Sequence, residues 1–382
     1  MPRKPALVVY CDHLLPFSQT FVLVQGEELQ QFTPYYVGSR LVKDLTLPAE
    51  RTFVVNRGGV LGKVREIPHK FWGIAPTLYQ RVQQLDPVLI HAHFGVGGAL
   101  ALPLKLMLKV PMVVTFHGFD ATVKDEYARR SFYGHRVYLR RREVLKHKAQ
   151  LFIAVSEFIR KKLLDKGFPP DKIVVHYIGV DTEAFRPDPN MPREPVVLFV
   201  GRLVEKKGCE YLIQAMSLVQ AARPEVELVV IGDGPLRPSL EQLAKKILRR
   251  YRFLGVQPVE SVRNWMNRAK VFSVPSVTAE SGNSEAFGIV FAESQAMGLP
   301  VVSFTSGGIP EAVAHGETGF LVAERDWEGL SKYIIHLLKD ETLWQCFSKK
   351  CRERVLTMFN LHSQTRALED IYETVLQRGN YE

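Results

Sequence analysis

The stretch Ser284-Glu285-Ala286-Phe287-Gly288-Ile289-Val290-Phe291-Ala292-Glu293 places two glutamates eight residues apart around a Phe-Gly step. From about Phe287 to Met297 apolar residues recur at helical spacing, which predicts a helix that begins near Gly288. Glu285 then lies on the loop before this helix, and Glu293 lies about one and a half turns inside it. The next residues, Gly298-Leu299-Pro300-Val301-Val302-Ser303, indicate a helix end followed by a buried strand.

The chemistry of this stretch suits a ligand with both phosphate and hydroxyl groups. Gly288 has no Cβ, so the backbone can approach a ligand closely there. A helix N-terminus offers free N–H groups and a partial positive charge, which favour phosphate. Ionised carboxylates only accept hydrogen bonds, and Glu285 and Glu293 therefore suit the paired hydroxyls of a sugar.

The rest of the chain repeats the same order of strand, loop and helix. Strands are expected over 6–10, 87–94, 112–118, 151–155 and 172–177 in the first half, and over 196–200, 227–231, 251–254, 271–275, 300–304 and 319–322 in the second. Helical patterns separate them and fill about the last 55 residues. Such alternation predicts parallel sheets covered by helices on both faces, with ligands beyond the carboxyl ends of the strands.

Length favours two domains, because 382 residues exceed what one hydrophobic core usually organises. Residues 186–195 contain four prolines and are interpreted as a linker. We therefore expect an N-terminal domain over 1–190 and a C-terminal domain over 191–382 with a helical tail.

Composition excludes several classes of protein. The chain has no run of 18 apolar residues, and its N-terminus leads directly into a strand, so we expect neither a membrane span nor a secretory signal. Cys11, Cys209, Cys346 and Cys351 have no metal-like spacing, which indicates free thiols in a reducing cytosol. The chain has no GxxxxGK[ST] loop and no GxGxxG fingerprint, which argues against an ATPase or a dehydrogenase.

Positive charge is concentrated in the first half. Residues 1–190 hold 27 Lys and Arg against 17 Asp and Glu, whereas residues 191–382 hold 23 of each. The basic residues are densest at Arg129-Arg130 and over 136–148, which includes Arg140-Arg141-Arg142, Lys146 and Lys148. Two interpretations stay open: docking on an anionic membrane face, or a solvated helix face. No nucleic-acid partner is expected, since no nucleic-acid-binding motif accompanies the patch.

Other polar clusters follow predicted strands. Gly201-Arg202-Leu203-Val204-Glu205-Lys206-Lys207-Gly208 offers two cations for phosphate, Arg202 as a bidentate fork and Lys207 as a point charge, unless both are exposed loop charges. Gly232-Asp233-Gly234-Pro235 is either a nucleotide contact or a plain turn. Gly307-Gly308-Ile309-Pro310-Glu311 similarly offers backbone N–H groups to an anion.

Histidines follow two strands of the first half. His117, in Phe116-His117-Gly118-Phe119-Asp120, could donate to a sugar hydroxyl or stabilise developing charge, with Asp120 orienting its ring; the alternative is a structural histidine. His91-Ala92-His93 supplies only two clustered ligands, so packing or hydrogen bonding is favoured over a metal site.

Taken together, these motifs resemble those of the retaining glycosyltransferases of family 4. That family has the GT-B architecture, two Rossmann-like domains that face each other across a cleft. The resemblance covers nearly the whole chain, and its most specific element is Glu285-(x)7-Glu293 followed by Ala296-Met297-Gly298-Leu299-Pro300-Val301-Val302. Further matching stretches are Gly201–Gly208, Ile231–Pro235, His117–Asp120, Gly179–Pro187 and Gly316–Val322.

The resemblance implies a nucleotide-diphospho-sugar donor, such as a UDP- or GDP-hexose, held by the C-terminal domain, with the acceptor on the N-terminal domain. Arg202 and Lys207 would hold the diphosphate and stabilise the leaving nucleotide, with neither a metal ion nor another cofactor. Glu285 and His117 would contact the hexose, and Glu293 would accept from the ribose hydroxyls. The remaining donor contacts would be Ala286, Phe287, Gly288, Ile289, Gly232 and Asp233.

The chain departs from the family pattern after its first strand. Pro16-Phe17-Ser18-Gln19-Thr20-Phe21 stands where many relatives have a glycine-rich loop, and it resembles the variant of exopolysaccharide, colanic-acid-type transferases. Ser18 would replace a backbone contact to the donor. Relatives of this group act on lipid-linked oligosaccharides, which implies a cytoplasmic enzyme at the inner face of the membrane.

Other activities remain as alternatives. One is a sugar-nucleotide epimerase of the same fold, although epimerases lack the Glu-Phe-Gly-Glu arrangement. A glycogen-type phosphorylase would need a longer chain with a pyridoxal-phosphate lysine. A third alternative is a sugar-nucleotide-binding or membrane-surface-binding protein without catalysis.

Overall fold

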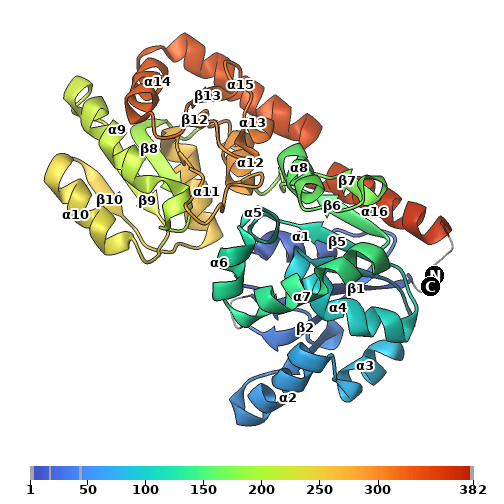
Figure 1. The fold of residues 1–382 in the computed structure, drawn as a ribbon. Helices are drawn as coiled ribbons and strands as arrows, with labels where there is room; N and C mark the ends of the chain where they lie inside the picture. The colour runs from blue at the N-terminus through green and yellow to red at the C-terminus, as the bar shows by residue number, and fades with distance from the viewer. Residues whose placement is uncertain (1–3, 17–18, 43–44, 379–382) are drawn as a thin grey trace. The chain divides into compact units, whose positions relative to one another are not determined.

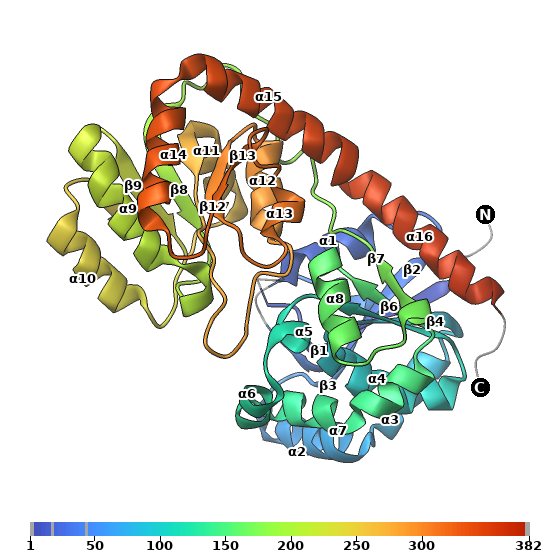
Figure 2. The same ribbon diagram turned by 45° about the horizontal axis from the view of Figure 1, so that its top comes forward.

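A computed structural model describes residues 4–16, 19–42 and 45–378 of the chain. The chain divides into two compact units, residues 1–179 with 361–382, and residues 180–360. Each unit is built on one parallel sheet flanked by helices (Figures 1 and 2). The predicted pair of parallel-sheet α/β domains is therefore confirmed.

The first sheet has seven parallel strands in the order β3-β2-β1-β4-β5-β6-β7. Their bounds are β1 (Ala6–Leu14), β2 (Thr33–Leu41), β3 (Thr52–Asn56), β4 (Pro87–His93), β5 (Met112–Phe116), β6 (Leu151–Ala154) and β7 (Ile173–Val175). Leu7, Val8 and Val9 of β1 are fully buried, because a central parallel strand is covered on both faces. This double burial explains why its sequence is continuously apolar rather than alternating.

Helices connect these strands in the first unit. They are α1 (Thr20–Glu27), α2 (Gly59–Trp72), α3 (Pro76–Gln83), α4 (Phe94–Leu108), α5 (Phe119–Thr122), α6 (Asp125–Arg130), α7 (Tyr133–Lys148) and α8 (Glu157–Asp165), with short 3-10 turns at η2 (Ala49–Arg51) and η3 (Pro170–Lys172). Serine is a favoured N-cap residue, and Ser156 caps α8: its hydroxyl accepts from the backbone N–H of Ile159 at 3.1 Å. Among the described residues, no helix combines the length and the apolar character needed to cross a membrane.

The second sheet has six parallel strands in the order β10-β9-β8-β11-β12-β13. The strands are β8 (Glu194–Val200), β9 (Glu227–Ile231), β10 (Tyr251–Phe253), β11 (Ala269–Phe272), β12 (Val301–Phe304) and β13 (Gly319–Val322). The helices are α9 (Cys209–Ala222), α10 (Arg237–Ile247), α11 (Val259–Arg268), α12 (Ile289–Ala296), α13 (Ile309–Ala312), α14 (Trp327–Lys339) and α15 (Glu341–Met358), with a 3-10 turn at η4 (Glu205–Lys207). Every strand predicted in this half is present, and α12 begins at Ile289, as the Gly288 pattern indicates.

Both sheets reverse their strand order at one point. The reversal lies between β1 and β4 in the first sheet and between β8 and β11 in the second. Loops on the two sides of such a point diverge, which leaves a crevice at the carboxyl ends of the strands. The loop after β8 holds Arg202 and Lys207, and the loop after β11 leads to Glu285, so the principal motif residues flank the reversal of the second sheet.

The C-terminal helix α16 (Leu361–Gln377) belongs to the first unit, which differs from the expected domain over 191–382. The buried carboxylate of Glu369 accepts the backbone N–H groups of Gln30 and Gln31 at 2.8 and 2.7 Å. The hydroxyl of Tyr372 is hydrogen-bonded to Nδ1 of His91 at 2.6 Å. Helical periodicity predicts that α16 exists, but it carries no information about which sheet the helix packs against.

The expected boundary at residue 190 also differs from the structure. Residues from Val180 onward belong to the second unit. The N–H of Val180 donates to the carbonyl of Phe359 at 2.7 Å, and the guanidinium of Arg352 donates to the carbonyl of Thr182 at 2.8 Å. The proline-rich stretch after Phe185 is also attached to the second unit, because Arg352 of α15 donates to the carbonyl of Phe185 just before it at 2.7 Å and the backbone N–H of Asp188 within it donates to Oδ1 of Asn267 at 3.1 Å.

The docking of α16 yields a first testable prediction. Replacing Tyr372 with Phe leaves the buried Nδ1 of His91 without this partner, which should lower the free energy of unfolding by about 1–3 kcal/mol. Tyr79→Phe is the matched control, because the buried hydroxyl of Tyr79 has no partner among the described residues. Thermal unfolding followed by circular dichroism measures both. Equal stability of the two variants would contradict the assigned role of the Tyr372–His91 bond.

Candidate active site

A buried ion pair joins the two principal motifs of the second unit. Nζ of Lys207, on the 3-10 turn η4, lies 2.5 Å from Oε2 of Glu285, although the two residues are 78 positions apart in sequence. Nζ of Lys206 lies 3.7 Å from Oε1 of the same carboxylate. Only 7% of Glu285 is exposed, so this carboxylate depends on the two lysines for its charge balance.

The cations outweigh the carboxylate in this cluster. Burial raises the pKa of Glu285, but the charges of Lys206 and Lys207 outweigh that effect and lower it to about 2. Burial lowers the pKa of Lys206, an effect that Glu285 opposes and that Lys207 and Arg202 reinforce. Two cations thus contact one carboxylate, and the charge of Arg202 acts on Lys206 as well, which leaves positive charge available for an anionic ligand.

Backbone packing between glycine loops holds this cluster in place. The carbonyl of Glu285 accepts the N–H of Gly308 at 2.9 Å, and a Cβ at Gly307 would lie 2.0 Å from that carbonyl oxygen. In the same way, a Cβ at Gly232 would lie 2.0 Å from the carbonyl oxygen of Gly201. Both Gly307 and Gly232 have positive φ, so these loops approach each other as only glycine allows.

The helix α12 carries the second glutamate. Gly288, at φ 77°, precedes its first residue and no side chain caps this N-terminus. Packing of protein around the carboxyl of Glu293 raises its pKa to about 7, an effect that the charge of Lys207 opposes. Glu285 and Glu293 therefore differ in kind: the first is held ionised, and the second titrates near neutral pH.

Four of the predicted donor contacts, Ala286 to Ile289, lie directly before and at the start of α12. Ala286 and Phe287 are buried, and the ring of Phe287 packs against Phe359 with centroids 5.0 Å apart. The side chain of Phe287 is thus part of the core, and only the backbone of this segment, up to Gly288 and Ile289, is suited to contact a ligand. Core packing of the ring fixes the path of that backbone.

The remaining predicted residues of the second unit are exposed. Arg202 is exposed and forms no ion pair with another described residue. The carboxylate of Asp233 accepts the N–H of Gly234 at 2.7 Å and pairs with Arg237 at 3.0 Å. Asp233 therefore stabilises the turn in which it lies, which agrees with the plain-turn interpretation of its sequence.

His117 lies in the first unit, directly after β5. Its Nε2 is hydrogen-bonded to Nδ1 of His93 at 3.0 Å, and its ring contacts Phe21 and Phe94 with centroids 4.9 and 4.7 Å apart. Burial lowers the pKa of His117 well below its usual range, and His93 adds to that effect. The ring is thus neutral at physiological pH, and its buried Nδ1 has no hydrogen-bond partner among the described residues.

Asp120 does not orient the ring of His117, contrary to the expectation from sequence. Its Oδ2 accepts the N–H of Gly95, and its Oδ1 accepts the N–H of Gly118 at 3.3 Å. Burial raises the pKa of Asp120 to about 6, although these backbone bonds lower it. The carboxylate joins the first turn of α4 to the loop after β5, while His93 orients His117.

The pair His91 and His93 has a structural role that sequence spacing alone left open. His91 is hydrogen-bonded through Nε2 to the hydroxyl of Thr115 at 2.6 Å and through Nδ1 to Tyr372. His93 bonds to His117, so the two imidazoles have protein partners. Within the described ranges, no group of three or more His, Cys, Asp or Glu side chains could hold a metal ion.

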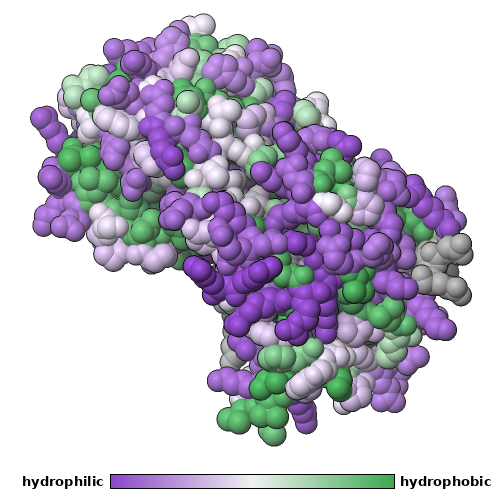
Figure 3. Space-filling view, viewed as in Figure 1, coloured by the Kyte–Doolittle hydropathy of each residue, from purple (hydrophilic) through white to green (hydrophobic). Residues whose placement is uncertain are grey.

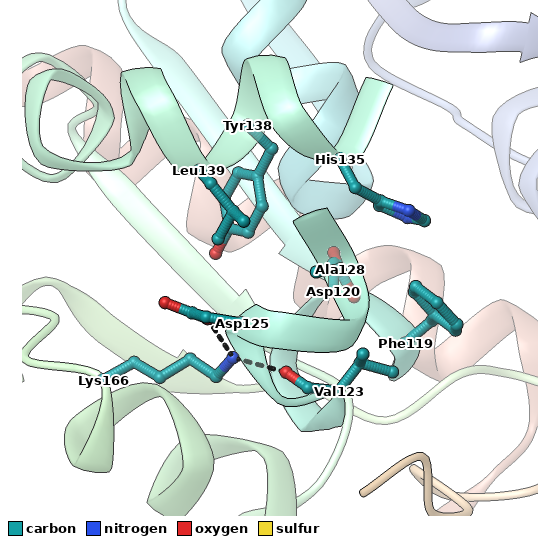
Figure 4. Close-up of a pocket in the computed structure, with 9 residues that line it drawn as sticks. All are labelled: Phe119, Asp120, Val123, Asp125, Ala128, His135, Tyr138, Leu139 and Lys166. Carbon is teal, nitrogen blue, oxygen red and sulfur yellow. Dashed lines mark hydrogen bonds and ion pairs between the residues drawn. The ribbon is translucent and has the colours of Figure 1, made fainter. Parts of the chain in front are cut away.

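A small cavity is lined in part by Phe119 and Asp120 of α5 (Figure 4). Its volume is about 10 Å³, room for about one water molecule, which is too small for a sugar. Lys166 bonds there to the carbonyl of Val123 at 3.0 Å and pairs with Asp125 at 3.5 Å (Figure 4). These contacts of Lys166 hold the end of α5 and the start of α6 in place, and the cavity is not a ligand site. Ser18, the other predicted contact of this unit, lies outside the described residues.

Sequence analysis missed several partners of the site. Lys206 is one of these partners, and the Lys206-Lys207 doublet makes both residues equally good candidates for binding an anion. Ser276 lies with its hydroxyl 3.5 Å from Oε2 of Glu285, and nothing in its sequence surroundings indicates this contact. Phe94, which packs on His117, has φ 66°, a left-handed conformation that is uncommon for a residue with a side chain.

The raised pKa of Glu293 gives a second testable prediction. Its value of about 7 in the folded chain exceeds the ordinary value of 4.5, so the folded chain binds this proton more tightly, and stability falls as pH rises from 4.5 to 7. Glu293→Gln should therefore raise the free energy of unfolding by at least about 1 kcal/mol above pH 7, with little change at pH 4.5. Urea unfolding at both pH values measures this difference. Glu328→Gln, on the exposed side of α14, is the control and should show no such pH dependence.

Comparison with known proteins places both units in one family. Residues 39–184 match the model described as Glycosyltransferase Family 4, and residues 181–354 match that of Glycosyl transferases group 1. WcaL of Salmonella typhimurium, whose name assigns it to colanic acid biosynthesis as a glycosyltransferase, is 30% identical over 295 residues, which cover 74% of this chain and 70% of WcaL. A GDP-mannose-dependent phosphatidylinositol monomannoside mannosyltransferase of Corynebacterium glutamicum is 37% identical over 42% of this chain and 46% of its own length.

The solved structures give the same assignment for the fold. HepE of Anabaena, crystallised with UDP and glucose, superposes with a TM-score of 0.75 and 20% identity, over 97% of this chain and 100% of HepE. At this identity the similarity concerns the fold, which is the GT-B fold that the motifs led us to expect. The chain therefore belongs to glycosyltransferase family 4, in the group that includes the colanic acid biosynthesis glycosyltransferase WcaL.

Proposed function

We propose that this glycosyltransferase moves a hexose from a nucleotide-diphospho-sugar to a hydroxyl group of a polysaccharide or lipid-linked saccharide, with retention of the anomeric configuration. The observation that carries the proposal is the contact of Lys206 and Lys207 with the buried carboxylate of Glu285, together with the charge of Arg202, which acts on Lys206. The excess positive charge of this cluster lies at the strand reversal of the second sheet and matches the charge of a diphosphate.

The cluster supplies what departure of the nucleotide requires. When the bond from the anomeric carbon to the diphosphate breaks, negative charge accumulates on the diphosphate oxygens. Fixed cations of Arg202 and Lys207 lower the energy of that charge, with no need for a metal ion. The uncapped N-terminus of α12 provides further N–H groups for the same anion.

The two glutamates take separate hydroxyl groups in this proposal. Glu285 is ionised at every physiological pH, so it only accepts hydrogen bonds and suits hydroxyls of the hexose. Glu293, eight residues further along, accepts from the ribose of the nucleotide. The neutral ring of His117 offers its unpartnered Nδ1 to the hexose near the reacting carbon.

The relatives support a class of donor, the nucleotide-diphospho-sugars, and not a particular sugar or nucleotide. HepE was crystallised with UDP and glucose, and the Corynebacterium relative is named for GDP-mannose. We accordingly propose a UDP- or GDP-hexose as the donor. We propose that the acceptor is a saccharide carried on a lipid, like the phosphatidylinositol monomannoside in the name of that relative, and that the reaction takes place at the cytoplasmic face of the membrane.

Substitution of the ion pair tests the proposal. Lys207→Gln and Glu285→Gln should each lower transfer by about 100-fold or more, since each removes a charge on which donor binding or leaving-group stabilisation depends. The assay is nucleotide release from UDP- and GDP-hexoses in the presence of a saccharide acceptor, with proton NMR of the product reporting its anomeric configuration. Lys245→Gln, on the exposed side of α10, is the control and should retain full activity.

The outcome also separates the alternatives. Nucleotide release that requires an acceptor identifies transfer, whereas conversion of the donor sugar without acceptor would identify an epimerase. Full activity in both ion-pair variants, with circular dichroism like that of the unsubstituted chain, would overturn the assignment of the cluster.

A chelator tests the role of the cations separately. Because Arg202 and Lys207 provide the charge that a divalent ion supplies in metal-dependent transferases, excess EDTA should leave the initial rate of nucleotide release unchanged. Loss of activity that returns on addition of Mg²⁺ or Mn²⁺ would contradict metal independence.

A further inference from the structure

The helix α2 exposes its apolar side chains, whereas two of its polar residues, Glu66 and His69, are buried. Val60 is 78% exposed, Leu61 73%, Val64 58% and Trp72 66%, and Ile67 and Phe71 of the same helix are also exposed. The buried residues are Gly62, Glu66 and His69. A surface helix of a soluble domain normally has the opposite arrangement, with its apolar stripe on the core.

Specific bonds hold α2 in this orientation. The buried carboxylate of Glu66 pairs with Lys70 at 2.7 Å and with Arg40 of β2 at 2.9 Å. Nε2 of His69 is hydrogen-bonded to the hydroxyl of Tyr10 in β1 at 2.9 Å. Rotating the helix to bury its apolar residues would break these bonds and leave their groups unpartnered, so the outward apolar face belongs to the folded state.

Cations surround this face. Arg57, Lys63 and Arg65 are exposed on α2 or just before it, and the only acidic residue of the helix, Glu66, is turned inward. The ring of Phe71 packs on Tyr133 of α7 at 4.3 Å. Burial raises the pKa of Tyr133, and the charges of Arg140, Arg141, Arg136 and Lys70 oppose that rise, so four more cations lie near the end of α2.

The basic stretch over 136–148 contributes to this surface only in part. Arg142 pairs with Asp125 at 2.7 Å, Lys146 pairs with Glu143 at 2.8 Å, and Arg141 donates to the carbonyl of Ala99 at 3.0 Å. Arg136 and Arg140 remain exposed and form no ion pair with a described residue. Figure 3 shows hydrophobic side chains gathered over α2, beside hydrophilic side chains over α6 and α7.

We propose that the outward face of α2 inserts into the interfacial region of an anionic membrane, with its cationic surroundings against the lipid headgroups. A helix with one apolar face and a basic border lies in this region with its apolar residues among the upper acyl chains. Aromatic residues such as Trp72 favour the same depth. This surface lies apart from the donor cluster, and the inference does not depend on which sugar the enzyme transfers.

Charge decides between a membrane and a second copy of the chain. A symmetric dimer through α2 would bring the same patch of both copies together. The cations around α2 would then face like charges, which disfavours the contact, whereas anionic lipid headgroups are complementary to them. The apolar face thus fits a lipid surface better than it fits itself.

Sedimentation with lipid vesicles tests the proposal. The full-length chain should bind vesicles of phosphatidylcholine and phosphatidylglycerol, and its tryptophan emission should shift to shorter wavelength, a shift that Trp72→Phe removes. The double variant Leu61→Ser/Val64→Ser should bind at least about tenfold more weakly, because the apolar contribution to binding scales with the buried apolar area. Arg136→Gln/Arg140→Gln should also weaken binding and reduce its dependence on salt.

The matched control is Val256→Ser/Val259→Ser, which removes two valines that are 66% and 50% exposed in the second unit and should bind like the unsubstituted chain. All four altered residues of the two serine variants are exposed, so both variants should fold normally. Binding by Leu61→Ser/Val64→Ser equal to that of the unsubstituted chain would overturn the proposal. Dimers in lipid-free ultracentrifugation that disappear in this variant, without vesicle binding by the unsubstituted chain, would overturn it in favour of self-association.

Discussion

The contact of Lys206 and Lys207 with the buried carboxylate of Glu285 is the interaction around which the second unit is organised. It joins the loop after β8 to the loop after β11, on the two sides of the strand reversal. A buried ion pair recovers only part of the cost of removing its charges from water, so such a cluster is weak evidence of a contribution to stability. Its excess of cations is better explained by an anionic ligand than by folding.

Further features of the site agree with that explanation. Glu293 has a pKa of about 7 because protein surrounds its carboxyl, and at neutral pH its ionised form costs stability. His117 and Phe94 carry comparable signs in the first unit, an unpartnered ring nitrogen and a left-handed backbone. Side chains and backbone conformations that cost stability, when they lie together at strand ends, are typical of ligand-binding sites.

The helix α2 shows where pattern reading from sequence reaches its limit. Its residues fall into an apolar and a polar set at helical spacing, and the usual rule assigns the apolar set to the core. In this chain, Arg40 and Tyr10 of the sheet bind Glu66 and His69, which turns the side of α2 that carries these two polar residues inward. Those partners come from strands of the sheet, so no short window of sequence around α2 contains the information.

The strand β2, with Pro34 and Gly38 inside it, was not predicted for a related reason. Only glycine fits at position 38, because a Cβ there would lie 2.3 Å from the carbonyl oxygen of Cys11 on the neighbouring strand.

Sequence patterns are enough to predict the alternation of strands and helices, the start of α12 after Gly288, the cap of α8 at Ser156, and the family to which the chain belongs. These features depend on periodicity, caps and motifs, which are local properties of the chain. Packing between distant segments sets the strand order that brings Lys207 to Glu285 across 78 positions, the return of α16 to the first unit, and the outward apolar face of α2. Burial, and with it the pKa values of Glu285, Glu293 and His117, depends on which distant segments pack together, and spacing along the chain does not encode that.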